Sequence, residues 1–122
     1  MSDGSPVPAG VIIWTEAERF EQLVGFYEAT LGMSPTNRRA EHVSFSHGEF
    51  RLILGVHDEI AGPSTDPLRV MINLIVPDIH AAVDGLPAAL FVRHPEREAW
   101  GGWIATLRDP DGNTVQLLQL PE

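Results

Sequence analysis

The sequence predicts an α+β protein of two βαβββ modules that together form a curved mixed sheet. The order strand, helix and three strands can be read twice, in residues 10–57 and 68–120, on either side of a turn-rich linker at 58–67. In addition, residues 48–54 align without a gap with residues 112–118. Two such copies must close on each other to bury a shared core, so a duplicated module is expected rather than a solenoid.

The first module opens with a short apolar strand, Gly10 to Trp14. Thr15 followed by Glu18 three residues later matches a capping box, which predicts a helix with Thr15 as its N-cap. Apolar residues then recur on one helical face, at Phe20, Leu23, Val24, Tyr27 and Leu31. Gly32 and Pro35 are expected to end this helix.

Three strands are expected after that helix, the second of them weak. Arg38 and Arg39 lie in a predicted loop. Val43 and Phe45 alternate with serines, as in a half-buried strand, and a two-residue turn at Gly48 leads into a strand at 50–56.

The second module repeats this order. A strand is expected at 70–76 and a short helix after Pro77 and Asp78, followed by strands at 90–93, 102–108 and 114–120. Residues 109–113 contain a proline, a glycine and two aspartates, which predicts a tight turn before the last strand. A ferredoxin-like sandwich is the alternative architecture, and it would need fewer strands.

Composition restricts the possible functions. The chain has 122 residues, which indicates one domain, and its apolar content of 43% is that of an ordinary globular protein. It has no cysteine, which excludes disulfides and a thiol nucleophile. A net charge of −9 argues against nucleic acid as a partner. No apolar run approaches a membrane span and no signal peptide is visible, so no membrane is expected and the predicted location is the cytoplasm.

Four fragments resemble one superfamily in order and spacing. They are the turn and strand at 109–120, the segment 25–32 at the end of the first helix, residues 76–83, and the approach to the seventh strand at 95–102. Together they resemble the vicinal oxygen chelate superfamily, which includes glyoxalases, bleomycin-resistance proteins and extradiol dioxygenases. The resemblance implies the glyoxalase/bleomycin resistance fold across nearly the whole chain.

The resemblance also implies where a metal would bind. In metal-dependent members each module supplies two ligands, one from its first and one from its last strand. The matching positions here are Ile12 or a neighbour, Leu52, Met71 (with Asn73 two residues on) and Gln116. A divalent cation needs histidine or carboxylate donors, and a neutral amide alone does not hold one. No cofactor is therefore expected, and a divalent metal is the less favoured alternative.

The histidines offer few other candidates. None of the five pairs at a ligand spacing, and exposed or hydrogen-bonded loop positions are expected for them. His94 with Glu96 or Glu98 is a hypothetical acid–base pair. Arg108 either faces solvent or attracts an anionic ligand, and the sequence leaves both open.

The tryptophans lead to a hypothesis about function. Trp14, Trp100 and Trp103 either fill a core or interface or offer flat surfaces on which a planar ligand can stack. The proposed ligand-binding set is Trp14, Leu52, Met71, Asn73, Trp100, Trp103 and Gln116. The leading hypothesis is a metal-free protein, expected to be a homodimer, that binds a small aromatic or apolar molecule in the concave sheet for sequestration or as a biosynthetic accessory. The alternatives are a glyoxalase-like lyase, isomerase or dioxygenase with a relocated metal or metal-independent acid–base chemistry, and a scaffold with an interaction role.

Overall fold

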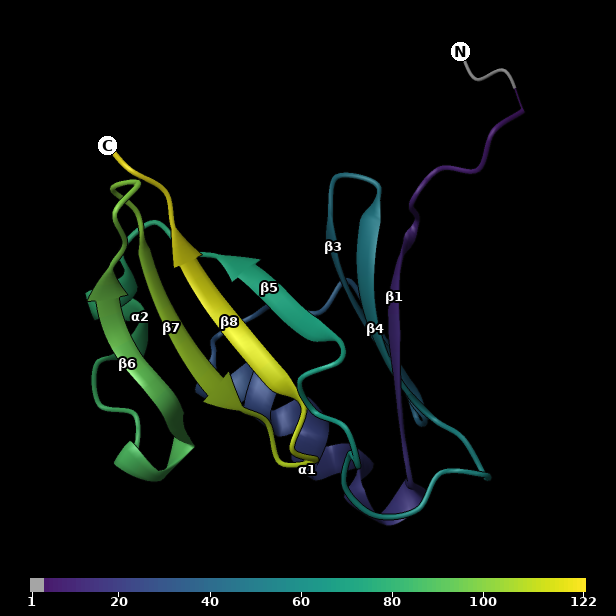
Figure 1. The fold of residues 1–122 in the computed structure, drawn as a ribbon. Helices are drawn as coiled ribbons and strands as arrows, with labels where there is room; N and C mark the ends of the chain where they lie inside the picture. Colours follow the sequence, from purple (N-terminus) through teal and green to yellow (C-terminus); the bar gives the residue numbers. More distant parts are fainter. Residues whose placement is uncertain (1–3) are drawn as a thin grey trace. The chain divides into compact units, whose positions relative to one another are not determined.

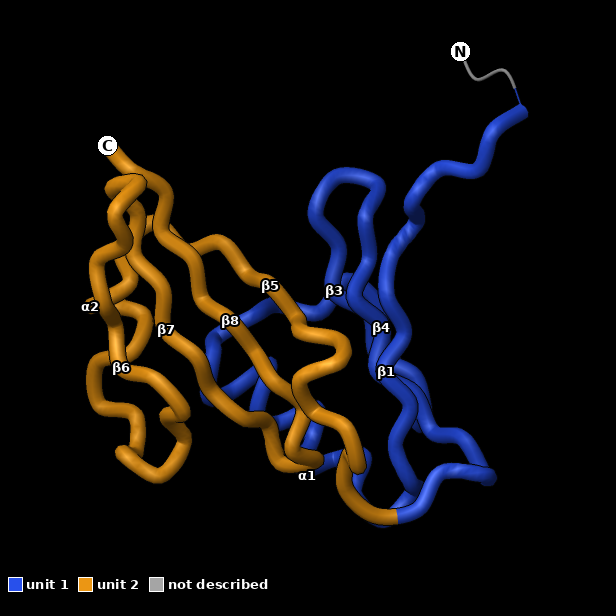
Figure 2. The backbone as a smooth tube through the Cα atoms, in the orientation of Figure 1, with its two compact units in different colours: residues 1–61 blue, residues 62–122 orange. Residues whose placement is uncertain are grey.

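The computed structural model describes residues 4–122, which fold into two compact units (Figures 1 and 2). The first unit ends at Ala61 and the second begins at Gly62, inside the expected linker. Each unit contains one strand, one helical segment and three further strands in that order. The predicted fold class, two βαβββ modules with mixed sheets, is confirmed.

The sheet of the first unit has the strand order β1-β4-β3-β2. Its strands are β1 (Gly10–Thr15), β2 (Asn37–Arg39), β3 (His42–His47) and β4 (Phe50–Val56). β1 runs parallel to β4, whereas the other pairs are antiparallel. Residues 37–39 were expected in a loop, but they pair with β3 as a short edge strand.

The helical segment of the first unit starts later than predicted. It consists of a 3₁₀ turn (η1, Ala17–Arg19), α1 (Phe20–Gly25) and a π-helical turn (η2, Phe26–Thr30). Thr15 is not the N-cap, because it is the last residue of β1 and pairs with Val56, and the helical segment begins without a side-chain cap. The expected apolar face is buried at Phe20, Leu23, Val24 and Tyr27, whereas Leu31 is half-buried.

One face of the first sheet is buried and the other is open. Val43, Phe45, Leu52 and Leu54 share the buried face and are at most 7% exposed. Phe45 contacts the ring of Tyr27, with centroids 6.4 Å apart. Burying aromatic and aliphatic side chains in this way is the main favourable contribution to folding.

The second unit has the strand order β5-β8-β7-β6 (Figure 1). Its elements are β5 (Met71–Ile75), α2 (Ile79–Val83), a 3₁₀ turn (η3, Ala88–Leu90), β6 (Phe91–Arg97), β7 (Trp103–Arg108) and β8 (Thr114–Gln119). Asp78 caps α2 by accepting hydrogen bonds from the backbone N–H groups of His80 and Ala81. The side chain of Gln119 accepts a further hydrogen bond from the N–H of Ile79, which ties the start of α2 to the end of β8.

β6 is longer than the sequence predicts and contains Pro95. A proline removes a hydrogen-bond donor, but β6 is an edge strand, where this loss is tolerated. The pairing with β7 shifts register twice, between Phe91 and Arg93 and between Arg93 and Glu96. These bulges place Arg93 beside Thr106 and Glu96 beside Ile104.

The turn between β7 and β8 has the predicted chemistry. The Asp109 carboxylate accepts hydrogen bonds from the backbone N–H groups of Asp111 and Asn113 and from the Asn113 amide. Gly112 takes φ 79°, which glycine adopts at little cost. Within the described part of the chain, no helix has the length and apolar character needed to span a bilayer.

Candidate functional site

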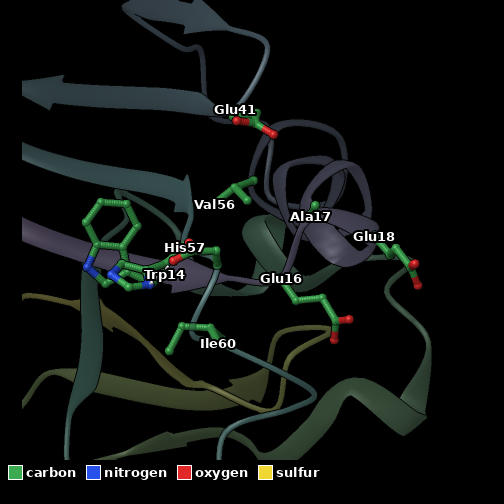
Figure 3. Close-up of a pocket in the computed structure, with 9 residues that line it drawn as sticks. Trp14, Glu16, Ala17, Glu18, Glu41, Val56, His57 and Ile60 are labelled. Carbon is green, nitrogen blue, oxygen red and sulfur yellow. Dashed lines mark ion pairs between the residues drawn. The ribbon is translucent and has the colours of Figure 1, made fainter.

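A pocket lies in the first unit beside the ends of β1 and β4 (Figure 3). Its volume is about 580 Å³. Its lining comes from the end of β1 and the residue after it, from η1, from the residue before β3, and from the end of β4 with the segment that follows it. The lining residues are Trp14, Glu16, Ala17, Glu18, Glu41, Val56, His57, Asp58 and Ile60.

Trp14 forms the aromatic wall of this pocket and is 41% exposed. Its partner across the β1–β4 pair is Gly55. A Cβ atom at Gly55 would lie 2.7 Å from the indole ring, so the absence of a side chain lets the ring lie against β4. The ring of His57 packs edge-on against Trp14, with centroids 5.4 Å apart and an interplanar angle of 69° (Figure 3).

The remainder of the pocket combines apolar groups with four carboxylates. Val56, Ala17 and Ile60 supply the apolar part, whereas Glu16, Glu18, Glu41 and Asp58 supply the acids, and no arginine among residues 4–122 lines the pocket. The Nδ1 atom of His57 accepts a hydrogen bond from the N–H of Glu59 at 3.1 Å. The same Nδ1 atom lies 3.6 Å from the carboxylate of Asp58.

The open face of the first sheet continues from Trp14 to Ile12, two residues earlier on β1. Ile12 is 48% exposed and pairs with Ile53. Leu52 belongs to the opposite face, is 7% exposed, and pairs with Val11 and Phe45. The gap-free alignment of the two halves therefore put Leu52 on the wrong face, because Ile53 occupies the position in this sheet that Gln116 occupies in the other.

The open face of the second sheet carries a row of polar side chains across its strands. Asn73, Gln116 and Thr106 are directly paired, and Arg93 extends the row on β6. The side-chain amide of Gln116 donates a hydrogen bond to the carbonyl oxygen of Asn73 at 2.9 Å. Met71 lies on the same face two residues before Asn73 and is 41% exposed.

These residues do not fit a divalent metal. The strand positions implied by the resemblance hold Ile12, Ile53, Asn73 or Met71, and Gln116 on the open faces. Only the two amides among them offer oxygen, and they already bond to each other. Residues 4–122 also contain no cluster of three histidine, aspartate or glutamate side chains that could hold a metal ion.

Trp103 does not join Gln116 on the open face. Trp103 shares the opposite face with Ala105 and packs edge-on against His80 of α2, with centroids 4.7 Å apart. Trp100 is 51% exposed and lies over Gly102, where a Cβ atom would be 2.0 Å from its ring.

The residues of the hypothetical acid–base pair, His94 with Glu96 or Glu98, each contact other residues in the structure. Both glutamates accept hydrogen bonds from Arg93, and the distance to Glu98 is 2.6 Å. The bonds to Glu96 and then to Glu98 raise the pKa of Arg93 above its ordinary value. His94 stacks on Phe91, with centroids 4.3 Å apart.

Most residues of the pocket were not predicted from the sequence. Of its nine lining residues, only Trp14 belonged to the predicted ligand-binding set. The missing signal was the parallel pairing of β1 with β4, which brings the residues that follow Val56 next to Trp14.

Comparison with known families agrees with this architecture. Residues 12–118 match the model of the glyoxalase-like domain family. No protein with a curated description matches the chain.

Solved structures share the fold at low sequence identity. A glyoxalase/bleomycin resistance protein/dioxygenase from Nocardioides is 18% identical with a TM-score of 0.71, and the alignment covers 99% of this chain and 87% of that one. TioX from Micromonospora sp. ML1 is 15% identical with a TM-score of 0.67, covering 93% and 98%. A lactoylglutathione lyase from Agrobacterium tumefaciens is 18% identical with a TM-score of 0.60, covering 94% and 93%. Because the family model spans both modules, this chain belongs to the glyoxalase-like domain family.

Proposed function

We propose that this glyoxalase-like protein binds a small planar molecule in the Trp14 pocket without using a metal. The observation that carries the proposal is a pocket of about 580 Å³ with an exposed indole as one wall. Pockets for small molecules usually measure about 300–1,000 Å³ and combine apolar walls with a few polar groups. The open face at Ile12 extends the apolar surface available to a ligand.

The lining residues also restrict the charge of the ligand. Within the part of the chain that the structure describes, four carboxylates and no arginine line the pocket, and the whole chain carries a net charge of −9. An anionic molecule would be repelled, whereas a neutral or cationic ring can stack on Trp14 without that penalty. We therefore propose a neutral or cationic planar ligand, held for sequestration or as an accessory to biosynthesis.

A fluorescence titration tests the proposal. A panel of planar natural products, neutral and cationic, is titrated into the wild-type protein, Trp14→Phe and Trp100→Phe. Saturable quenching is expected for the wild type and Trp100→Phe, and it should be lost in Trp14→Phe. If no compound quenches the wild type, or if Trp14→Phe retains the full response, the proposal is wrong.

Gly55→Ala should weaken this binding at least tenfold while the protein remains folded. The new Cβ atom would meet the Trp14 ring at 2.7 Å, so the indole must move away from β4. Gly25→Ala is the matched control, because a Cβ atom there meets nothing within 4 Å. Affinities from the same titration, with circular dichroism to confirm folding, measure the effect. Equal affinities in the two variants would contradict the assigned role of Trp14.

A metal-dependent lyase, isomerase or dioxygenase is the competing hypothesis, and thermal shift separates it from the proposal. A metal at one hundred times its dissociation constant would stabilise the fold by about 2.7 kcal/mol. Such a gain corresponds to several degrees in Tm. We expect nickel, zinc, manganese and iron(II) each to leave Tm unchanged within about one degree. A metal that raises Tm and survives dialysis against a chelator would favour the enzyme.

We also propose that the chain forms a homodimer. The open face of the second sheet exposes Met71 and Ile75, at 41% and 66%, and a second copy would cover such apolar surface. Light scattering after size-exclusion chromatography tests this, and a monomer at micromolar concentration would contradict it.

A further inference from the structure

His57 is the histidine that lines the Trp14 pocket, among residues 4–122 (Figure 3). Its ring packs edge-on against Trp14, with centroids 5.4 Å apart. Its backbone N–H donates to the carbonyl oxygen of Thr15 at 3.0 Å, which ties the residue to the end of β1. A proton gained by this ring therefore changes the charge of the pocket wall itself.

The turn that follows β4 depends on the side chain of His57. Its Nδ1 atom accepts a hydrogen bond from the N–H of Glu59 at 3.1 Å, and its carbonyl oxygen accepts one from the N–H of Ile60 at 3.2 Å. The first bond resembles that of an Asx turn, in which a side chain accepts from the backbone N–H two residues later. Together the two bonds hold the segment that contributes Ile60 to the pocket lining.

Protonation of His57 at Nδ1 is incompatible with the bond from Glu59. A ring nitrogen accepts a hydrogen bond through its lone pair, and a proton on that nitrogen removes the acceptor. In the imidazolium both ring nitrogens are donors, and the carboxylate of Asp58 lies 3.6 Å from Nδ1. A small rotation of the ring therefore exchanges the bond from Glu59 for an ion pair with Asp58.

The charges around the pocket favour an imidazolium as well as a cationic ligand. Carboxylates reach the pocket from the start of the helical segment, from the residue before β3 and from the segment after β4. The titratable groups around His57 are Glu16, Glu18, Glu41, Asp58, Glu59 and, beside Gly55 on β3, His42. Because opposite charges attract, a protonated His57 and a cationic ligand compete for the same carboxylates and repel each other.

From these contacts we infer that protonation of His57 opens the turn at 57–60 and releases a cationic ligand from the Trp14 pocket. This role of His57 rests on the proposed function, since it concerns the same pocket. Histidine is the side chain whose ordinary change of charge falls between about pH 5 and 8, where carboxylates ordinarily stay ionised. The pocket therefore holds a cation in neutral solution and releases it in weakly acidic solution.

Nuclear magnetic resonance of the free protein between about pH 8 and pH 5.5 tests the switch without a ligand. The amide proton of Glu59 should shift upfield as the ring of His57 titrates, because it loses its hydrogen bond. In His57→Asn the shift should stay nearly constant, since an asparagine carbonyl also accepts from the N–H two residues later but does not titrate.

His80→Gln is the matched control, because His80 also packs edge-on against a tryptophan but lies in the second unit. Its Glu59 amide should titrate as in the wild type. A Glu59 amide that does not follow the His57 ring, or that titrates equally in His57→Asn, would overturn the inference.

Calorimetry with N-methylquinolinium, a planar cation whose charge does not depend on pH, gives a second readout. Its affinity should fall about three- to tenfold from pH 8 to pH 5.5 in the wild type and in His80→Gln, a modest change because exposed ion pairs are weak. In His57→Asn the affinities at the two pH values should agree within about twofold.

The two proposals can fail separately. If the probe binds the wild type equally at both pH values, or if His57→Asn shows the same fall, the switch alone is wrong. If the probe binds at neither pH, the binding of a cation is contradicted and its release with it, whereas the amide titration still decides whether His57 controls the turn.

Discussion

Asp109→Ala is expected to lower the free energy of unfolding by about 3 kcal/mol. The Asp109 side chain is 4% exposed and accepts three hydrogen bonds, each 2.9 Å long. Hydrogen bonds to a charged group contribute about 1.5–3 kcal/mol each, and they are not additive within one cluster. Alanine would leave the N–H groups of Asp111 and Asn113 without their acceptor in a turn that must close β7 onto β8. Urea unfolding followed by circular dichroism measures the loss.

Asp66→Ala is the matched control for this substitution. The carboxylate of Asp66 accepts a hydrogen bond from Arg69, but its side chain is 57% exposed and the pair is open to solvent. Exposed ion pairs contribute about 0–1 kcal/mol, so the control should lose less than about 1 kcal/mol. Similar losses in the two variants would mean that the carboxylate of Asp109 does not organise the turn.

The same turn shows why part of this fold could be predicted from the sequence. The Asp109 side chain bonds to Asp111 and Asn113, which lie within four positions of it, so the local pattern of aspartate, proline and glycine was sufficient. The N-cap of α2 at Asp78 was predictable for the same reason. Interactions of this kind depend on neighbours that the sequence already places together.

Thr15 shows where local reasoning failed. Its spacing to Glu18 fits a capping box, yet it is fully buried and pairs with Val56, 41 positions later. A ladder of backbone hydrogen bonds to a distant strand outweighed the local cap. The Trp14 pocket escaped prediction for a related reason, because Glu18, Glu41 and Asp58 come together only through the pairing of β1, β3 and β4.

Leu52 illustrates a different limit of prediction from the sequence, which is the choice of the alternate residues of a strand that face the core. The β3–β4 turn has two residues, between His47 and Phe50, whereas the β7–β8 turn has five, between Arg108 and Thr114. Two modules whose sequences align without a gap can therefore bury opposite sets of aligned residues in their last strands. A shift of one residue exchanges the buried and open sets completely. The residues of the open face, and hence of any site on it, could not be assigned until the pairing was known.

The face that β4 turns toward the core determines the second large effect. Leu54→Ala is expected to lower the free energy of unfolding by about 3–4 kcal/mol. Leu54 is fully buried in β4 between Ile13 of β1 and Val43 of β3. Truncating a buried leucine removes apolar contacts and leaves a cavity, which costs about 2–5 kcal/mol. A central strand paired on both sides cannot relax easily to fill that space.

Ile53→Ala is the control, because Ile53 precedes Leu54 on the same strand but lies on the half-buried open face. Its truncation should cost only about 1 kcal/mol, as is usual outside a core. Chemical denaturation of the wild type and both variants gives the comparison directly. The alignment that places Leu52 on the open face also places Leu54 there and turns Ile53 inward, so it predicts the opposite order of losses. A larger loss for Ile53→Ala would therefore show that β4 pairs one residue out of the register described, and it would exchange the side chains available to a ligand on this sheet.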